Sequence, residues 1–168
     1  MSQVSVDISQ ILDAHYDAIF AFSVRALGCR QEAEDLTQDV CLSLSEKLPE
    51  FRGDAKVTSW LYRIVINAAH DRMRKQMRYA RAGADWGSRE IALKEDQQNL
   101  KEGQTFLREA MMRMDPSDRI TLALVVTGGF SQAEVAEILD VAPGTVAWRM
   151  SEIKKNLASM ACPQGEVA

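Results

Sequence analysis

Apolar residues recur every three or four positions along most of this chain, which is the spacing of one face of an α-helix. The pattern predicts helices over residues 5–27 and 31–48, ended by Gly28 and by Pro49 respectively. No segment shows the alternation of a half-buried strand. We therefore expect an all-α fold.

A third helix is expected to begin at Thr58 or Ser59, either of which could cap it, and to run to about Arg78. The preceding segment FRGDAKV, at 51–57, is typical of a loop. We expect Trp60 to lie in a small helical core. The inward face of this helix should carry Leu61, Ile64, Val65 and Ala68.

The helical pattern fails between residues 82 and about 104, where AGADWGSRE and DQQNLKEGQ are polar and rich in glycine. This composition indicates a flexible linker with partial helix around IALKED. Its length suits two separately folded units. We therefore expect a first domain at 5–81, a linker at 82–105 and a second domain at 106–162.

The second half begins with a strong helix start, because Asp115 can cap and Pro116 can occupy the first helical position. Ser131 and Glu134 have the spacing of a capping box for the next helix. A last helix should open at Pro143 and reach about Met160.

Residues 131–157 have the spacing of a helix-turn-helix. Ala136 is small where the two helices approach, and Asp140 tolerates the left-handed backbone that the turn requires. Such a motif places the N-terminal half of its last helix in the major groove of DNA. A helical hairpin without a DNA role is the alternative. The expected outward residues are Thr145, Trp148, Arg149, Glu152 and Lys155.

The segment AEDLTQDVCLSL places Asp35, Gln38 and Asp39 on one side of a helix. Three interpretations are open: a solvated acidic face, a metal site, or a docking surface for a basic partner. The metal site would need matching ligands from another helix, and the sequence offers none.

The segment from Phe51 to Lys75 combines aromatic residues with cations and amides. Its loop could hold a base from separated DNA strands, since such bases are read by pockets and stacking. The cations that follow fit either a solvated helix end or a stripe that contacts phosphates. They are Arg72, Arg74, Lys75, Arg78 and Arg81.

Composition excludes several classes of function. Three cysteines and two histidines in 168 residues argue against a disulfide scaffold and a histidine-rich metal site. The formal net charge of −4 argues against non-specific coating of nucleic acid. We find neither a spanning segment nor a secretion signal, and expect a cytoplasmic protein without cofactors.

The ordered set AEDLTQDV, FRGDAKVTSWLYRIVINAAHDRMRK and SQAEVAEILDVAPGTVAWRMSEIKKNL resembles the extracytoplasmic-function (ECF) sigma factors of bacterial RNA polymerase. The resemblance covers roughly residues 10–160. It implies a sigma-2 domain and a sigma-4 domain, both helical. It also implies three partners: core RNA polymerase, promoter DNA and an anti-sigma factor that holds the protein inactive until a stress signal arrives.

The resemblance also implies which residues act. Polymerase docking falls on Asp35, Leu36, Gln38 and Asp39. Recognition of the −10 promoter element falls on Asp54, Lys56, Ser59, Arg63, Asn67, Arg72 and Arg74. Recognition of the −35 element falls on Thr145, Trp148, Arg149, Glu152 and Lys155. Two features depart from the family pattern, because Trp148 stands where a small polar residue is common and Asp140 replaces the usual glycine.

Two other classes of protein remain as alternatives. A helix-turn-helix repressor or activator would normally dimerise on palindromic DNA and would need no acidic docking helix. An enzyme is the weaker alternative, because the sequence has no Ser–His–Asp order, phosphate loop, zinc spacing or glycine fingerprint.

Overall fold

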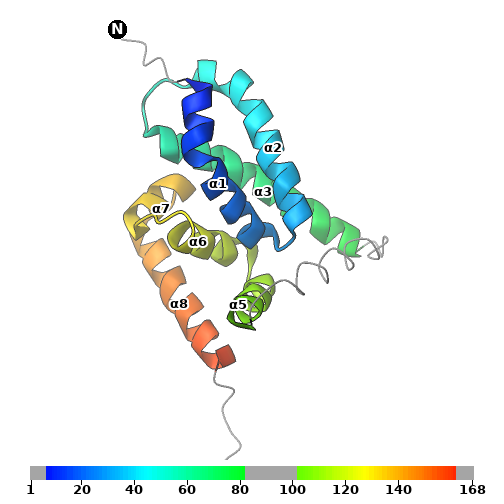
Figure 1. Ribbon diagram of the computed structural model, residues 1–168. Helices are drawn as coiled ribbons and strands as arrows, with labels where there is room; N and C mark the ends of the chain where they lie inside the picture. The colour runs from blue at the N-terminus through cyan, green and yellow to red at the C-terminus, as the bar shows by residue number, and fades with distance from the viewer. Residues whose placement is uncertain (1–6, 82–101, 162–168) are drawn as a thin grey trace, which may run out of the picture.

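The computed structural model describes residues 7–81 and 102–161 (Figure 1). All regular elements in these two ranges are helices, as the periodicity predicts. They are α1 (Ile8–Leu27), α2 (Arg30–Lys47), the short 3-10 helix η1 (Leu48–Glu50), α3 (Val57–Arg81), α5 (Glu102–Arg113), α6 (Pro116–Val126), α7 (Gln132–Leu139) and α8 (Pro143–Ala161).

Local chemistry places several helix ends where the sequence predicts them. Gly28 ends α1 in the left-handed conformation, with φ 72°. Asp115 caps α6 by accepting from the Ser117 N–H, and Pro116 is the first residue of that helix. Ser131 and Glu134 form the predicted capping box of α7.

The predicted start of α3 is wrong. The helix begins at Val57, and the Lys56 carbonyl accepts the Trp60 N–H at 3.0 Å. The chain bends over residues 53–55, where Gly53 has φ 79°, and is already aligned with the helix axis at Lys56. Thr58 and Ser59 therefore lie inside the helix and do not cap it.

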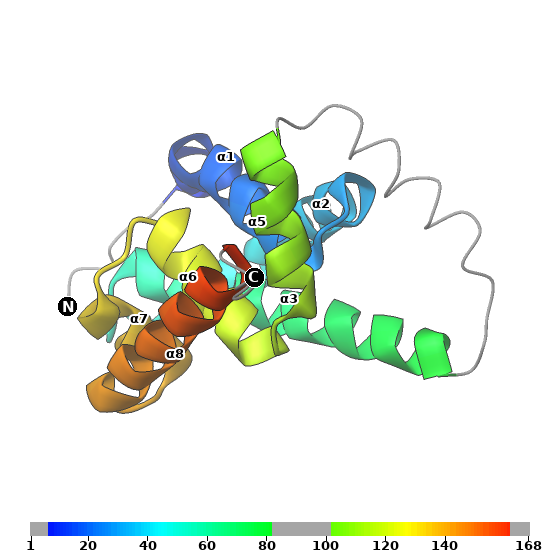
Figure 2. The same ribbon diagram turned by 90° about the horizontal axis from the view of Figure 1, so that it is seen from below.

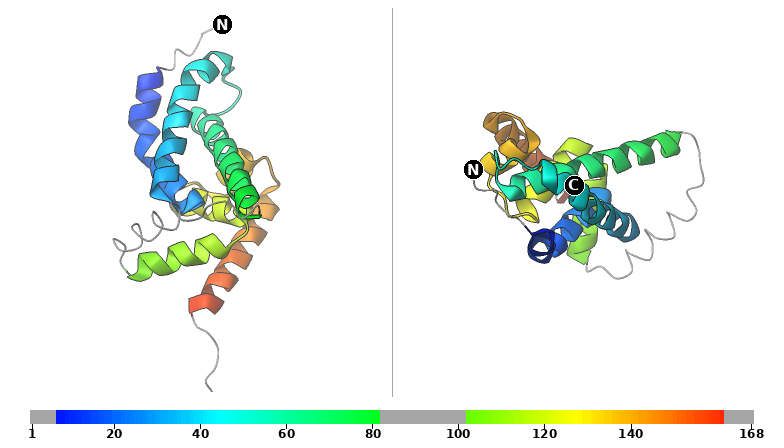
Figure 3. Two further views of the ribbon diagram at one scale, coloured as in Figure 1. Left: turned by 90° about the vertical axis from the view of Figure 1, so that its right-hand side faces the viewer. Right: turned by 90° about the horizontal axis from the view of Figure 1, so that it is seen from above.

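Helices α1, α2 and α3 lie side by side and bury their facing sides (Figure 3). Helices α6, α7 and α8 form the second unit, beneath the first in Figure 1. Helix α5, which the sequence did not predict, packs near the end of α1. At this contact Met112 lies so close to Gly28 that a Cβ atom there would collide with its sulfur.

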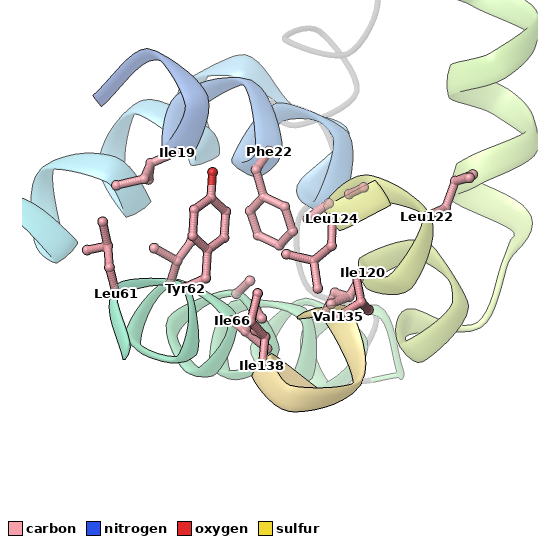
Figure 4. Close-up of a cluster of buried hydrophobic side chains, with 14 of the residues drawn as sticks. Ile19, Phe22, Leu61, Tyr62, Ile66, Ile120, Leu122, Leu124, Val135 and Ile138 are labelled. Atoms are coloured by element: carbon pink, nitrogen blue, oxygen red, sulfur yellow. The ribbon is translucent and has the colours of Figure 1, made fainter. Parts of the chain in front are cut away.

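The two units pack on each other in this structure. Tyr62 of α3 contacts Phe22 of α1 on one side, with ring centroids 5.9 Å apart. On the other side it contacts Phe130, from the loop before α7, at 4.7 Å. Buried residues of both units form one continuous hydrophobic cluster around this point (Figure 4).

The buried face of α3 is wider than predicted because both units pack on it. Leu61 and Val65 are fully buried as expected, whereas Ile64 and Ala68 are only partly buried. The buried residues of this face that the sequence did not predict are Tyr62, Ile66, Ala69 and Met73.

We predict that Asp140→Gly raises the free energy of unfolding by about 0.5–1 kcal/mol, because glycine adopts the left-handed region at little steric cost. Asp140 has φ 54°, the single positive φ of a non-glycine residue in the described ranges. Urea unfolding followed by circular dichroism measures the effect. Asp115→Ala is the control and should lower stability by about 1 kcal/mol, because it removes a cap. A lower urea midpoint for Asp140→Gly would contradict this prediction.

Candidate docking and nucleic-acid interfaces

Three of the four predicted docking residues form one exposed surface on α2. This surface consists of exposed residues on adjacent turns of α2, namely Asp35, Gln38 and Asp39. We call it the α2 outer face. Leu36 is 0 % exposed and belongs to the hydrophobic core beneath them. Leu36 can therefore support this surface but has no area with which to touch a partner.

Asp39 is already paired with a residue from the predicted DNA-binding set. The Arg72 guanidinium of α3 donates to Asp39 Oδ2, and its other terminal nitrogen lies 3.6 Å from Glu32 Oε2. The Arg72 side chain is 21 % exposed, whereas that of Asp39 is 66 % exposed. One cation thus connects two surfaces that the sequence presents as separate.

Two further cations of the predicted −10 set contact helix α7 of the other unit. Lys56 Nζ lies 3.3 Å from Glu134 Oε1, and Arg63 Nη2 donates to the Glu137 carbonyl oxygen at 2.8 Å. Hydrogen bonds from Ser131, and then the Lys56 ammonium, hold the pKa of Glu134 below its ordinary value. Helix α7 therefore occupies part of the surface predicted to meet promoter DNA.

The remaining members of the predicted −10 set are divided between surface and core. Asp54 and Asn67 are exposed, and Arg74 is exposed while it pairs with Asp71 of its own helix. Ser59 is buried and cannot meet DNA in this arrangement.

Trp60 is half-buried, so the expectation that it lies in the core is only partly correct. Its ring packs on Phe51 at the start of the loop, with centroids 5.1 Å apart. This contact closes the base of the loop that contains Asp54.

The predicted −35 residues share one side of α8, but they differ in exposure. Trp148 is 64 % exposed, and Lys155 is exposed and donates to Glu152 at 2.6 Å. Thr145 and Arg149 are half-buried. On the inward side of α8, Val146, Met150 and Ile153 are buried and Leu157 is partly buried.

Three arginines that the sequence does not single out join the two units at the end of α1, and we call them the arginine latch. Arg119 donates to the Ala26 carbonyl oxygen at 3.1 Å and to that of Met114 at 3.2 Å. Arg108 donates to the Gly28 carbonyl oxygen, and Arg25 donates to Thr127 Oγ1. Cations suit these positions because the last carbonyls of a helix lack partners within it. No local pattern in the sequence reveals such long-range contacts.

Across the described ranges, His, Cys, Asp and Glu side chains form no group that could hold a metal ion. Of the helices in these ranges, none is both long enough and apolar enough to cross a membrane. Cys29 is buried, and burial raises the pKa of the Cys41 thiol, which disfavours its reactive thiolate form. Cys162, the partial helix expected around IALKED and most of the predicted linker lie outside the described residues.

Solved structures support the fold. One is the sigma factor RpoE bound to the anti-sigma factor NepR from Bartonella quintana. It has a TM-score of 0.72 and 24% identity, with 92% of this chain and 96% of that chain covered. CnrH, solved with the cytosolic domain of CnrY, has a TM-score of 0.67 and 20% identity, covering 94% of this chain and 89% of that one.

Sequence comparisons give the family. Residues 11–79 match the family model of Sigma-70 region 2, and residues 107–157 match that of Sigma-70 region 4. The ECF sigma factor SigM of Mycobacterium tuberculosis is 30% identical over 151 residues, which cover 90% of this chain and 75% of SigM. SigW of Bacillus subtilis is 29% identical, with 84% of this chain and 82% of SigW covered. The chain belongs to the ECF RNA polymerase sigma factors.

Proposed function

We propose that this sigma factor docks on core RNA polymerase through the α2 outer face and reads a promoter with two further surfaces. The −10 element would meet the loop before α3 and the exposed side of that helix, through Asp54, Lys56, Arg63, Asn67, Arg72 and Arg74. The −35 element would meet α8 through Thr145, Trp148, Arg149, Glu152 and Lys155. Family membership supports the overall function, and the exposure of these side chains supports most of the individual roles.

The chemistry of the α2 outer face favours a basic protein partner. Two carboxylates and an amide on neighbouring turns can bind guanidinium and ammonium groups directly. Leu36 and Thr37 lie buried behind them, so the backbone that carries the face is firmly held. We assign Leu36 a supporting role and Ser59, also buried, a structural one.

The observation that carries the mechanism is that α7 covers cations needed for promoter contact. With Lys56 on Glu134 and Arg63 on the Glu137 carbonyl, a phosphate or a base must compete with these partners for both cations. Helix α7 belongs to the helix-turn-helix, so this unit lies over part of the −10 surface, while Trp148 on α8 stays exposed. We propose that this closed form is the resting state and that the units separate when the protein engages polymerase.

An anti-sigma factor would act by stabilising the closed form. RpoE, which shares this fold, was solved in complex with the anti-sigma factor NepR. We propose that such a partner binds this sigma factor in the cytoplasm, where polymerase is available. The arginine latch can open at low cost, because solvent can satisfy these carbonyls and guanidinium groups once the units part.

A helix-turn-helix regulator acting alone is the second candidate function. The exposure of Trp148 on α8 favours DNA contact by this unit. A regulator of this kind would have no role for the α2 outer face. This second function therefore accounts for fewer features of the molecule than the sigma-factor function does.

We predict that Asp39→Lys weakens binding to core polymerase by about 2–5 kcal/mol, because it sets a like charge against a basic surface. Fluorescence anisotropy titration with labelled protein measures the affinity. Asp17→Lys is the matched control, since Asp17 is an exposed aspartate on α1, away from the α2 outer face. Equal affinities for Asp39→Lys and the unmodified protein would remove this face from the proposed interface.

We predict that the free chain binds promoter duplex weakly and with a shallow salt dependence, because Lys56, Arg63 and Arg72 have internal partners. With core polymerase, the promoter should be bound tightly and specifically. Each phosphate that a cation neutralises adds about −0.9 to the slope of log affinity against log salt. Filter binding over a salt series, with and without core, tests this. Tight, specific binding by the free chain would show that the closed form does not restrain it.

We predict that Phe130→Ala opens the two units, because it removes the ring that packs on Tyr62 from the second unit. Small-angle X-ray scattering should show a larger radius of gyration with unchanged helix content by circular dichroism. Leu42→Ala is the control, because Leu42 is exposed on α2 and should leave the profile unchanged. A compact Phe130→Ala variant would mean that other contacts suffice for closure.

A further inference from the structure

Arg72 belongs to the predicted DNA-binding set, yet in this structure it is bound to the docking surface. We propose that Arg72 is an exchangeable occupant of Asp39, released toward promoter DNA when a cation of the polymerase takes its place. Docking and promoter contact would then be coupled through one side chain. This inference rests on the proposed docking role of the α2 outer face.

The position of Arg72 fits an occupant that can be displaced. Its two terminal nitrogens bridge Glu32 and Asp39, which lie two turns apart on α2. Asp39 remains 66 % exposed in this pairing, so a partner can approach it from solvent. Ion pairs that are open to water on one side are weak and exchange readily.

A basic group arriving at Asp39 would also meet the charge of Arg72. Two cations on one carboxylate repel each other at short range, so the incoming group weakens the hold on Arg72. The side chain has room to leave, since α2 and α3 enclose a groove of about 390 Å³. The groove is lined by Ala68, Lys75 and Tyr79 in addition to the ion-paired residues.

Released Arg72 would strengthen an existing cationic site. Lys75 lies one turn further along α3, is exposed, and forms no ion pair with the residues that the structure describes. The end of α3 that carries it extends away from the body of the protein (Figure 2). Once released, Arg72 would be a second cation beside Lys75 and could contact one further phosphate of the promoter DNA. Because such coupling is reciprocal, DNA bound at Arg72 would also favour docking at Asp39.

A purely structural ion pair predicts something different. If Arg72 only holds α2 and α3 together, its loss weakens polymerase binding and DNA binding alike. If Arg72 competes for Asp39, its loss strengthens polymerase binding and weakens DNA binding. The opposite signs make the two roles distinguishable with one substitution.

The test is Arg72→Met, which keeps much of the apolar stem and removes the charge. We expect its affinity for core polymerase to rise about 2–5-fold, the size of a weak ion pair. The holoenzyme formed with it should bind promoter with a salt slope shallower by about 0.9. Arg30→Met is the control, because it removes an exposed ion pair with Glu34 on α2 and should change neither quantity.

A second variant, Arg72→Lys, keeps the charge but cannot bridge two carboxylates through a planar guanidinium. It should raise core affinity less than Arg72→Met and retain the salt slope. Unchanged or weaker core binding by both variants would overturn the exchange, even if Asp39→Lys still abolishes docking. If Asp39→Lys also binds core normally, the proposed docking function itself fails.

Discussion

The packing of Tyr62 between Phe22 and Phe130 is the contact on which the rest of the structure depends. Tyr62 of α3 packs on Phe22 of α1 and also on Phe130 in the loop before α7. The hydrophobic cores of the two units are therefore continuous. Burial of large aromatic rings contributes more than the exposed ion pairs around them. This junction brings α7 against α3, and the contacts of α7 with Lys56 and Arg63, which we propose to meet the promoter, follow from it.

Three cations that we propose for promoter contact also have partners within the chain. Lys56, Arg63 and Arg72 each have an oxygen partner on α7 or α2. These partners are individually weak, because they are exposed to water and compete with it. Such contacts restrain binding without preventing it, since phosphates and a polymerase surface can replace them. The mild negative net charge of −4 is consistent with a protein that relies on a larger partner to hold DNA.

The sequence predicted elements whose causes are local. The Gly28 end of α1, the capping box at Ser131 and the left-handed Asp140 each depend on a few neighbouring residues. The exposed α2 outer face also followed from helical spacing. The merged core could not be predicted, because periodicity shows that a face is apolar but not what covers it. The same holds for Arg72 and for the contacts of the arginine latch with α1 and Gly28, because these partners lie 33 or more residues away in the chain.

The central claim is that the free chain is closed and that engagement with polymerase separates its units. The distance between one label at Glu46 on α2 and another at Ser151 on α8, both exposed positions, tests this by pulsed electron spin resonance. The account predicts one narrow distance population in the free protein and a shift to longer distances once core polymerase is added. The same distribution in both states would contradict it.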